Sequence, residues 1–113
     1  MFSALYDDIS ETYVRLIMGD VYTLTSTIDT DQAHKPQYQF RFNLFKKNVE
    51  SFESLFSKTS TVVNPYRYDD FRNDLAKFIS TIDQDLKKSH IERNDVNYLR
   101  KQFESLRNDV EDL

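Results

Sequence analysis

Apolar side chains recur every three or four residues along most of the chain, which is the spacing of amphipathic helices. Ser89 and Glu92 have the three-residue spacing of a capping box, in which two side chains bond free backbone N–H groups at the start of a helix. The pattern therefore predicts a helix over about residues 90–112. Its apolar stripe consists of Val96, Leu99, Phe103, Leu106, Val110 and Leu113.

Three further stripes predict three further helices. The first runs from Phe2 to Ile28, and the second begins at Pro36 and ends near Lys58. The third is expected over about residues 65–87, because Asn64 is a good N-cap and Pro65 suits the first helical position. The second and third stripes contain Phe42, Phe45, Val49, Phe52 and Phe56, and Phe71, Leu75, Phe78, Ile82 and Leu86.

Two parts of the chain resemble each other at an offset of 54 residues. Ser26-Thr27-Ile28-Asp29 recurs as Ser80-Thr81-Ile82-Asp83, within ten identities over the 35 positions 20–54. The copies, at about 10–58 and 64–112, would each form a helical hairpin with an apolar face that it cannot bury alone. We therefore expect one all-α domain over 1–113, an antiparallel four-helix bundle. The same faces could also pair between two chains.

An α+β fold is the alternative, with a β-hairpin at about 21–44. Residues 21–28 are rich in β-branched side chains, and residues 37–44 alternate between polar and apolar. The matched segments at 75–86 and 95–104 have helical spacing instead. Because duplicated segments should share one backbone conformation, the helical interpretation is favoured.

Composition fits long helices, since the 113 residues include one glycine, two prolines and no cysteine. The absence of cysteine excludes a disulfide framework, a thiolate metal site and a cysteine nucleophile. No apolar run approaches the roughly 20 residues that span a bilayer. Asp7, Asp8 and Glu11 give the first residues the wrong charge for a targeting peptide. We expect a cytoplasmic protein without a membrane partner.

Charge is unevenly distributed along the chain. The net charge of −4 argues against nucleic-acid binding. Residues 35–58 nevertheless have a charge of +3, and the aromatic residues Tyr38 and Phe40 lie among their basic side chains. Because aromatic side chains stack on nucleobases, nucleic-acid binding through the second helix is one alternative function. Glu50 and Glu53, however, interrupt this basic segment. The basic residues of this segment are Lys35, Arg41, Lys46, Lys47 and Lys58.

No arrangement typical of an enzyme occurs in the sequence. There is no glycine-rich phosphate loop or serine elbow, so we expect no catalysis, no catalytic residues and no cofactor. A metal-binding bundle is a second alternative, because Asp31 and His34 are three residues apart. The position that matches His34 in the second copy is Lys88, which weakens this alternative. A cation or basic partner could also bind the repeated acids Asp29, Asp31, Asp83 and Asp85, or these could be solvated.

The aromatic content is the strongest hint of function, with nine phenylalanines and seven tyrosines. Several lie off the main apolar stripes, and tyrosine is enriched at binding surfaces. We therefore expect a non-enzymatic protein-interaction module, such as an adaptor, an assembly subunit or a small inhibitor. Its partner would be another protein or a second copy of the chain. The expected partner-binding residues are Tyr38, Phe40, Tyr66, Tyr68 and Tyr98. Alternatively, the apolar stripes are wider than the residues assigned to them, and these side chains belong to the core.

Overall fold

A computed structural model describes the backbone of residues 2–58 and 65–113, and the side chains of residues 8–56 and 66–113. Within these ranges the chain forms helices and no strand. The α-helices are α1 (Phe2–Thr27), α2 (Lys35–Lys58), α3 (Asp69–Lys87) and α4 (Arg93–Glu111). Two short 3₁₀ segments, η1 (Gln32–His34) and η2 (Pro65–Tyr68), precede α2 and α3. The predicted all-α fold is confirmed, and the alternative β-hairpin at 21–44 is wrong because α1 and α2 occupy that segment.

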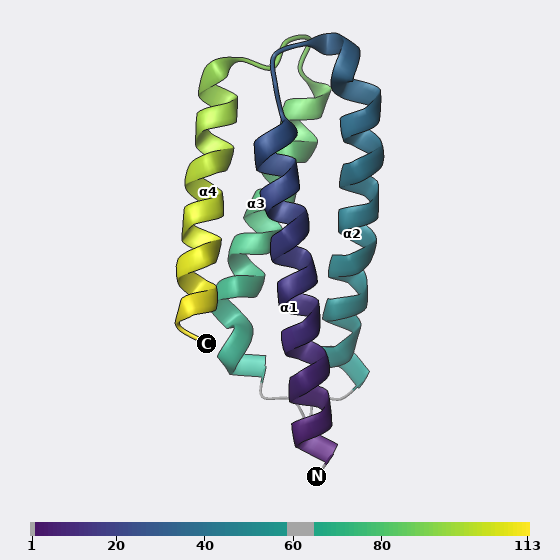
Figure 1. Ribbon diagram of the computed structural model, residues 1–113, viewed down its shortest axis with the longest axis vertical. Coiled ribbons are helices and arrows are strands. Elements are labelled where there is room, and N and C mark those ends of the chain that lie inside the picture. Colours follow the sequence, from purple (N-terminus) through teal and green to yellow (C-terminus); the bar gives the residue numbers. More distant parts are fainter. Residues whose placement is uncertain (1, 59–64) are drawn as a thin grey trace.

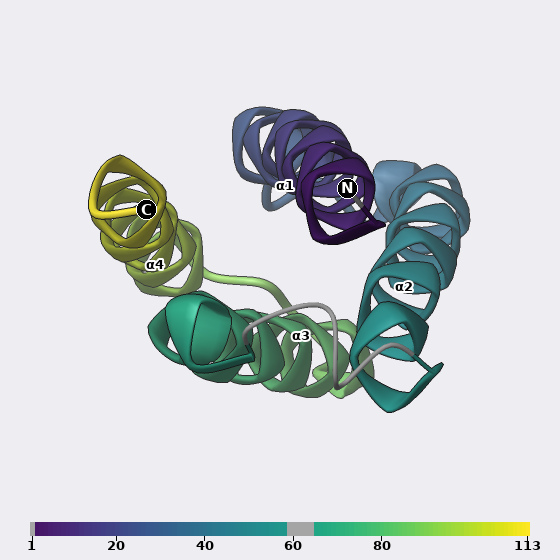
Figure 2. The same cartoon turned by 90° about the horizontal axis from the view of Figure 1, so that it is seen from below.

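The four helices form an antiparallel bundle, each running against its neighbours along one long axis (Figure 1). Seen along that axis, they follow one another around the bundle in chain order (Figure 2). Each helix therefore has two neighbours, and α1 lies beside both α2 and α4. The backbones of α1 and α2 approach each other over the longest stretch, whereas α2 and α3 approach over the shortest. The interface between α2 and α3, which we call the α2–α3 seam, is thus the most loosely packed of the four interfaces between neighbouring helices.

Aromatic rings fill the core between α2 and α3. Phe45 and Phe78 meet edge to face, with ring centroids 5.8 Å apart. Phe52 has three ring neighbours: Phe56 at 5.0 Å, and Tyr68 and Phe71 at 5.8 Å each. Such pairs add stabilisation beyond the apolar area they bury. The α2–α3 seam is therefore filled by side chains on the side that faces the core, but it is open on the side that faces solvent.

The two hairpins bury equivalent positions, 54 residues apart. Phe52 and Leu106 form one such pair, and both side chains are fully buried. Further buried pairs at this offset are Val14 with Tyr68, Ile17 with Phe71, Val21 with Leu75, Leu24 with Phe78, Ile28 with Ile82, Phe42 with Val96, and Phe45 with Leu99. The common origin of the hairpins stays a prediction, but their core positions share one register.

Two predicted helix starts are wrong. The helix expected from residue 65 begins as η2, and α3 itself starts at Asp69, while the expected N-cap Asn64 lies outside the described residues. The N-cap of α4 is Glu92, and the capping box joins Glu92 to Asp95 instead of Ser89 to Glu92. The carboxylate of Asp95 accepts the backbone N–H of Glu92 at 2.9 Å and the Lys88 ammonium at 2.7 Å. One side chain thus serves both a cap and an ion pair, which fixes the start of α4.

Replacing Asp95 by alanine is expected to lower the free energy of unfolding by about 1–2 kcal/mol, because the cap and the contact with Lys88 are lost together. Urea denaturation followed by circular dichroism measures this loss. Asn94→Ala is the matched control, since Asn94 is exposed and lies next in the chain. Equal stabilities of the two variants would contradict the role given to Asp95.

Candidate functional site

Two of the five expected partner-binding residues are buried, so their predicted exposure is wrong. Tyr38 is 6% exposed, and its hydroxyl donates to the Leu24 carbonyl at 2.8 Å. Burial raises the pKa of Tyr38. Tyr68 is fully buried, with its ring 5.8 Å from Phe52 and 5.6 Å from Phe56. The core stripes are wider than the sequence pattern indicated, and both tyrosines belong to them.

The other three expected residues are exposed but lie far apart. Phe40 is 64% exposed on α2, and Tyr98 is 55% exposed on α4, at the diagonally opposite corner of the bundle. Tyr66 is 80% exposed in η2, at the other end of the long axis. These side chains do not form one surface. A binding role for each of them stays a prediction.

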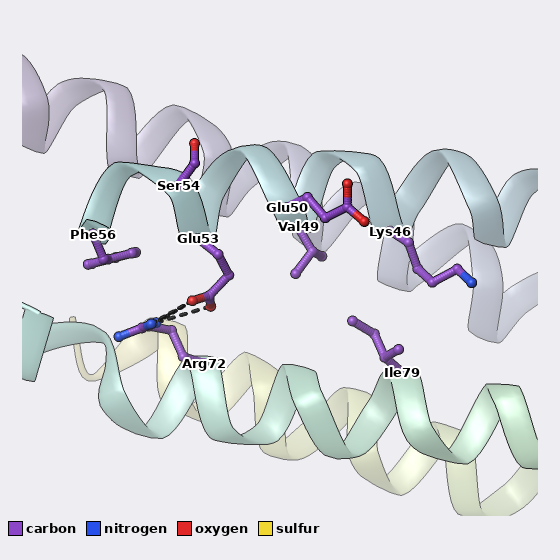
Figure 3. Close-up of a pocket in the computed structure, with 8 residues that line it drawn as sticks. All are labelled: Lys46, Val49, Glu50, Glu53, Ser54, Phe56, Arg72 and Ile79. Atoms are coloured by element: carbon purple, nitrogen blue, oxygen red, sulfur yellow. Dashed lines mark hydrogen bonds and ion pairs between the residues drawn. The ribbon is translucent and has the colours of Figure 1, made fainter. Parts of the chain in front are cut away.

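A groove runs along the α2–α3 seam and was not anticipated from the sequence. Its larger hollow, of about 720 Å³, is lined by Val49, Phe56 and Ile79 together with polar residues of both helices. A second hollow of about 370 Å³ shares Val49 and Ile79 and extends to Leu75 and Ala76. In Figure 3, Val49 and Ile79 point from facing helices into the space between them. We call this surface the α2–α3 groove.

An ion pair bridges the α2–α3 groove near Phe56. The Arg72 Nε donates to both carboxylate oxygens of Glu53, at 3.0 and 3.1 Å (Figure 3). The same guanidinium lies 4.3 Å from the centre of the Phe56 ring. Hydrogen bonding to Glu53 raises the pKa of Arg72. This bridge closes one end of the groove over an aromatic floor.

A weaker contact spans the other end of the groove. The Lys46 ammonium lies 3.9 Å from the Asp83 carboxylate and 4.6 Å from the centre of the Phe42 ring. Both charged groups are partly exposed, and exposed ion pairs contribute little to stability. Lys46, one of the basic residues expected to contact nucleic acid, is therefore already engaged with an acid. The groove between the two bridges is mostly apolar.

The repeated aspartates have different surroundings. A carboxylate oxygen of Asp29 lies 2.6 Å from the His34 Nδ1, and this hydrogen bond raises the pKa of His34. The Asp31 carboxylate caps η1 by accepting the Ala33 N–H. Asp83 faces Lys46, whereas Asp85 is buried beside Lys88. Among the residues described, no three metal-ligating side chains come together. The four acids thus do not gather into one site.

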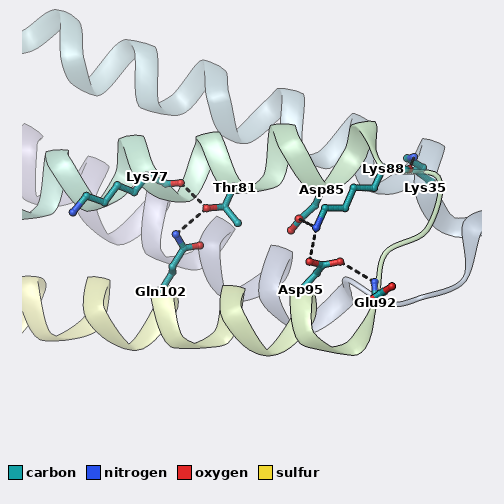
Figure 4. A network of polar contacts seen from close by, with 8 residues as sticks. All are labelled: Lys35, Lys77, Thr81, Asp85, Lys88, Glu92, Asp95 and Gln102. Atoms are coloured by element: carbon teal, nitrogen blue, oxygen red, sulfur yellow. Dashed lines mark hydrogen bonds and ion pairs between the residues drawn. The ribbon is translucent and has the colours of Figure 1, made fainter.

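Asp85 belongs to a polar network that joins the two hairpins (Figure 4). The Lys88 ammonium lies 3.5 Å from Asp85 and 2.7 Å from Asp95. Burial raises the pKa of Asp85, whereas hydrogen bonding to Lys88 lowers the pKa of Asp95. The Lys35 ammonium, from the first hairpin, donates to the Lys88 carbonyl at 2.9 Å. These contacts fasten the turns at this end of the bundle to one another.

A pair of carboxyl groups at the opposite end was missed by the sequence analysis. Burial and a hydrogen bond with Asp74 raise the pKa of Asp109 to about 7. The position 54 residues before Asp109 is Leu55, which packs against the core. An acidic residue in one copy whose equivalent in the other copy is apolar was the sequence signal that could have identified Asp109.

No protein-family model, curated protein or solved structure matches the chain. Of the helices described, none combines the length and apolarity needed to cross a bilayer. The function is therefore inferred from the surfaces of the bundle, among which the α2–α3 groove combines apolar lining residues with charged edges.

Proposed function

We propose that the protein is a non-enzymatic interaction module, an adaptor, assembly subunit or small inhibitor, that binds a helix of its partner in the α2–α3 groove. The observation that supports this proposal is the loose seam between α2 and α3, which leaves apolar side chains at the bottom of an open groove. Apolar grooves with a few polar groups at their edges are typical binding sites.

A helix suits the shape of this groove. Two antiparallel helices form its walls, and an amphipathic helix can place side chains at positions i, i+3, i+4 and i+7 between such walls. Lys46 and Glu53, which form the bridges at the two ends of the groove, are seven residues apart on one wall, which corresponds to a rise of about 10 Å. That length accommodates about two turns of a partner helix.

Charged side chains at the edges would set the orientation of the partner. Glu53 and Arg72 pair with each other across the groove, and Glu50 is exposed beside them. A bound helix with suitably placed charges can exchange hydrogen bonds with this pair. Charges at the rim of an interface affect specificity and association rate more than affinity.

Replacing Ala76 by tryptophan tests the proposal. Ala76 is exposed and lines the groove, so a large side chain there would occupy the partner's space without disturbing the core. A phage library of amphipathic helical peptides is selected on the unmodified protein, and the enriched peptides are measured by titration calorimetry. We expect Ala76→Trp to weaken their binding at least about tenfold, or 1.4 kcal/mol.

Ser105→Trp is the matched control, since Ser105 is exposed on α4, diagonally across the bundle from α2. It should leave the affinity within about twofold of the unmodified protein. Peptides that bind both tryptophan variants equally well would show that the groove is not the binding site.

A further inference from the structure

The α1–α4 seam lies on the side of the bundle opposite the α2–α3 groove (Figure 2). Arg93, Arg100 and Arg107 follow one another on α4 at intervals of seven residues. Because seven residues make nearly two helical turns, these arginines share one face of the helix. They extend over a rise of about 21 Å.

Two hollows along this seam share Arg100. One, of about 520 Å³, is also lined by Tyr22, Lys101 and Phe103. The other, of about 170 Å³, is lined by Arg93 together with Ile28, Asp29 and Thr30, which directly follow α1. Arg100 therefore lies between two adjoining depressions, with a second basic residue beside it in each.

The acids Asp29 and Glu104 also line these two hollows, but Asp29 pairs with His34 and Glu104 with Arg107. In the described part of the protein, Arg93, Arg100 and Lys101 form no ion pair or side-chain hydrogen bond. Arg107 differs, because it lies 3.3 Å from Glu104. A chain with a net charge of −4 thus presents a local group of unpaired basic residues.

An aromatic platform lies among these basic residues. Tyr22 is 61% exposed, and its ring centre is 6.0 Å from that of Phe103. The Arg107 guanidinium lies 5.9 Å from the centre of the Phe103 ring. An apolar side chain of a ligand can pack on Tyr22 while acidic groups on either side meet the arginines.

We propose that the α1–α4 seam is a second binding surface, which takes an acidic segment of a partner protein. Its carboxylates contact Arg93, Arg100 and Lys101, and an apolar side chain packs on Tyr22. The charge pattern favours a short acidic peptide over nucleic acid, because the overall negative charge repels a long polyanion. Since the two surfaces lie on opposite sides, two partners can bind at once.

The test uses a fluorescein-labelled peptide of alternating glutamate and aspartate with one central phenylalanine, titrated at low salt. Arg100→Glu combined with Lys101→Glu should weaken binding at least about tenfold. Arg41→Glu combined with Lys47→Glu is the matched control, with the same change in net charge at exposed basic residues of α2. That control should change the affinity by about twofold or less.

A second matched pair examines the aromatic platform. Tyr22→Ala should weaken peptide binding about threefold or more, whereas Phe40→Ala, at a similarly exposed ring, should not. Circular dichroism verifies that every variant is folded. Equal losses in both double variants, no binding up to about 1 mM, or tighter binding of a dodecamer of deoxythymidine than of the peptide would each overturn the proposal.

Discussion

Replacing Phe52 by alanine is expected to lower the free energy of unfolding by about 3–5 kcal/mol, because a fully buried ring is removed from the centre of the aromatic core. Phe52 contacts the rings of Phe56, Tyr68 and Phe71, which belong to α2, η2 and α3. The cavity would therefore open where both hairpins meet. Since small domains have only about 5–15 kcal/mol of stability, a large part of it would be lost.

Phe40→Ala is the matched control for this prediction. It makes the same chemical change in the same helix, but Phe40 is 64% exposed, so we expect a change within about 0.5 kcal/mol. Urea denaturation followed by circular dichroism compares the two variants. Similar losses of stability would mean that the aromatic core is misplaced.

Replacing Asp109 by asparagine is expected to stabilise the protein by about 1–2 kcal/mol at pH 8, while leaving its stability at pH 4 nearly unchanged. Burial and the contact with Asp74 raise the pKa of Asp109 from 3.8 to about 7. Between these values the folded state binds more protons than the unfolded state. The contribution of this group to stability is therefore lost as the pH rises through about 7.

Denaturation at a series of pH values measures this effect. The Asp109→Asn variant should have a smaller decrease in stability between about pH 5 and pH 8 than the unmodified protein, because its amide does not ionise. Asn108→Ala, at the exposed and non-titratable neighbour of Asp109, is the control and should leave the pH dependence unchanged. An unchanged pH dependence in Asp109→Asn would contradict the raised pKa of Asp109.

The helices could be predicted because their apolar spacing extends over many turns. The offset of 54 residues between the copies also favoured helix over strand for residues 21–44. The spacing defines only the centre of each buried stripe, however. Tyr38 and Tyr68 were expected at a binding surface, yet both rings are buried.

The groove could not be predicted from sequence, because periodicity does not say how closely two helices approach. Val49 and Phe56 were correctly assigned to a helical stripe, but the loose packing of α2 against α3 depends on side chains of both helices. The Arg72–Glu53 bridge joins residues 19 positions apart, which no local pattern indicates. The cap on α4 was missed because Asp95, and not Glu92, bonds back to the free backbone N–H of the N-cap, where Lys88 also contacts it.

The most direct test of the proposed function is an NMR titration of methyl-labelled protein with the peptide selected most strongly. We predict chemical-shift changes and intermolecular NOEs at the methyl groups of Val49, Leu75 and Ile79, which line the α2–α3 groove. Leu16 and Leu44, each 48% exposed and absent from the lining of that groove, should remain unaffected. Shifts confined to Leu16 and Leu44, with the groove methyls unchanged, would contradict the proposal.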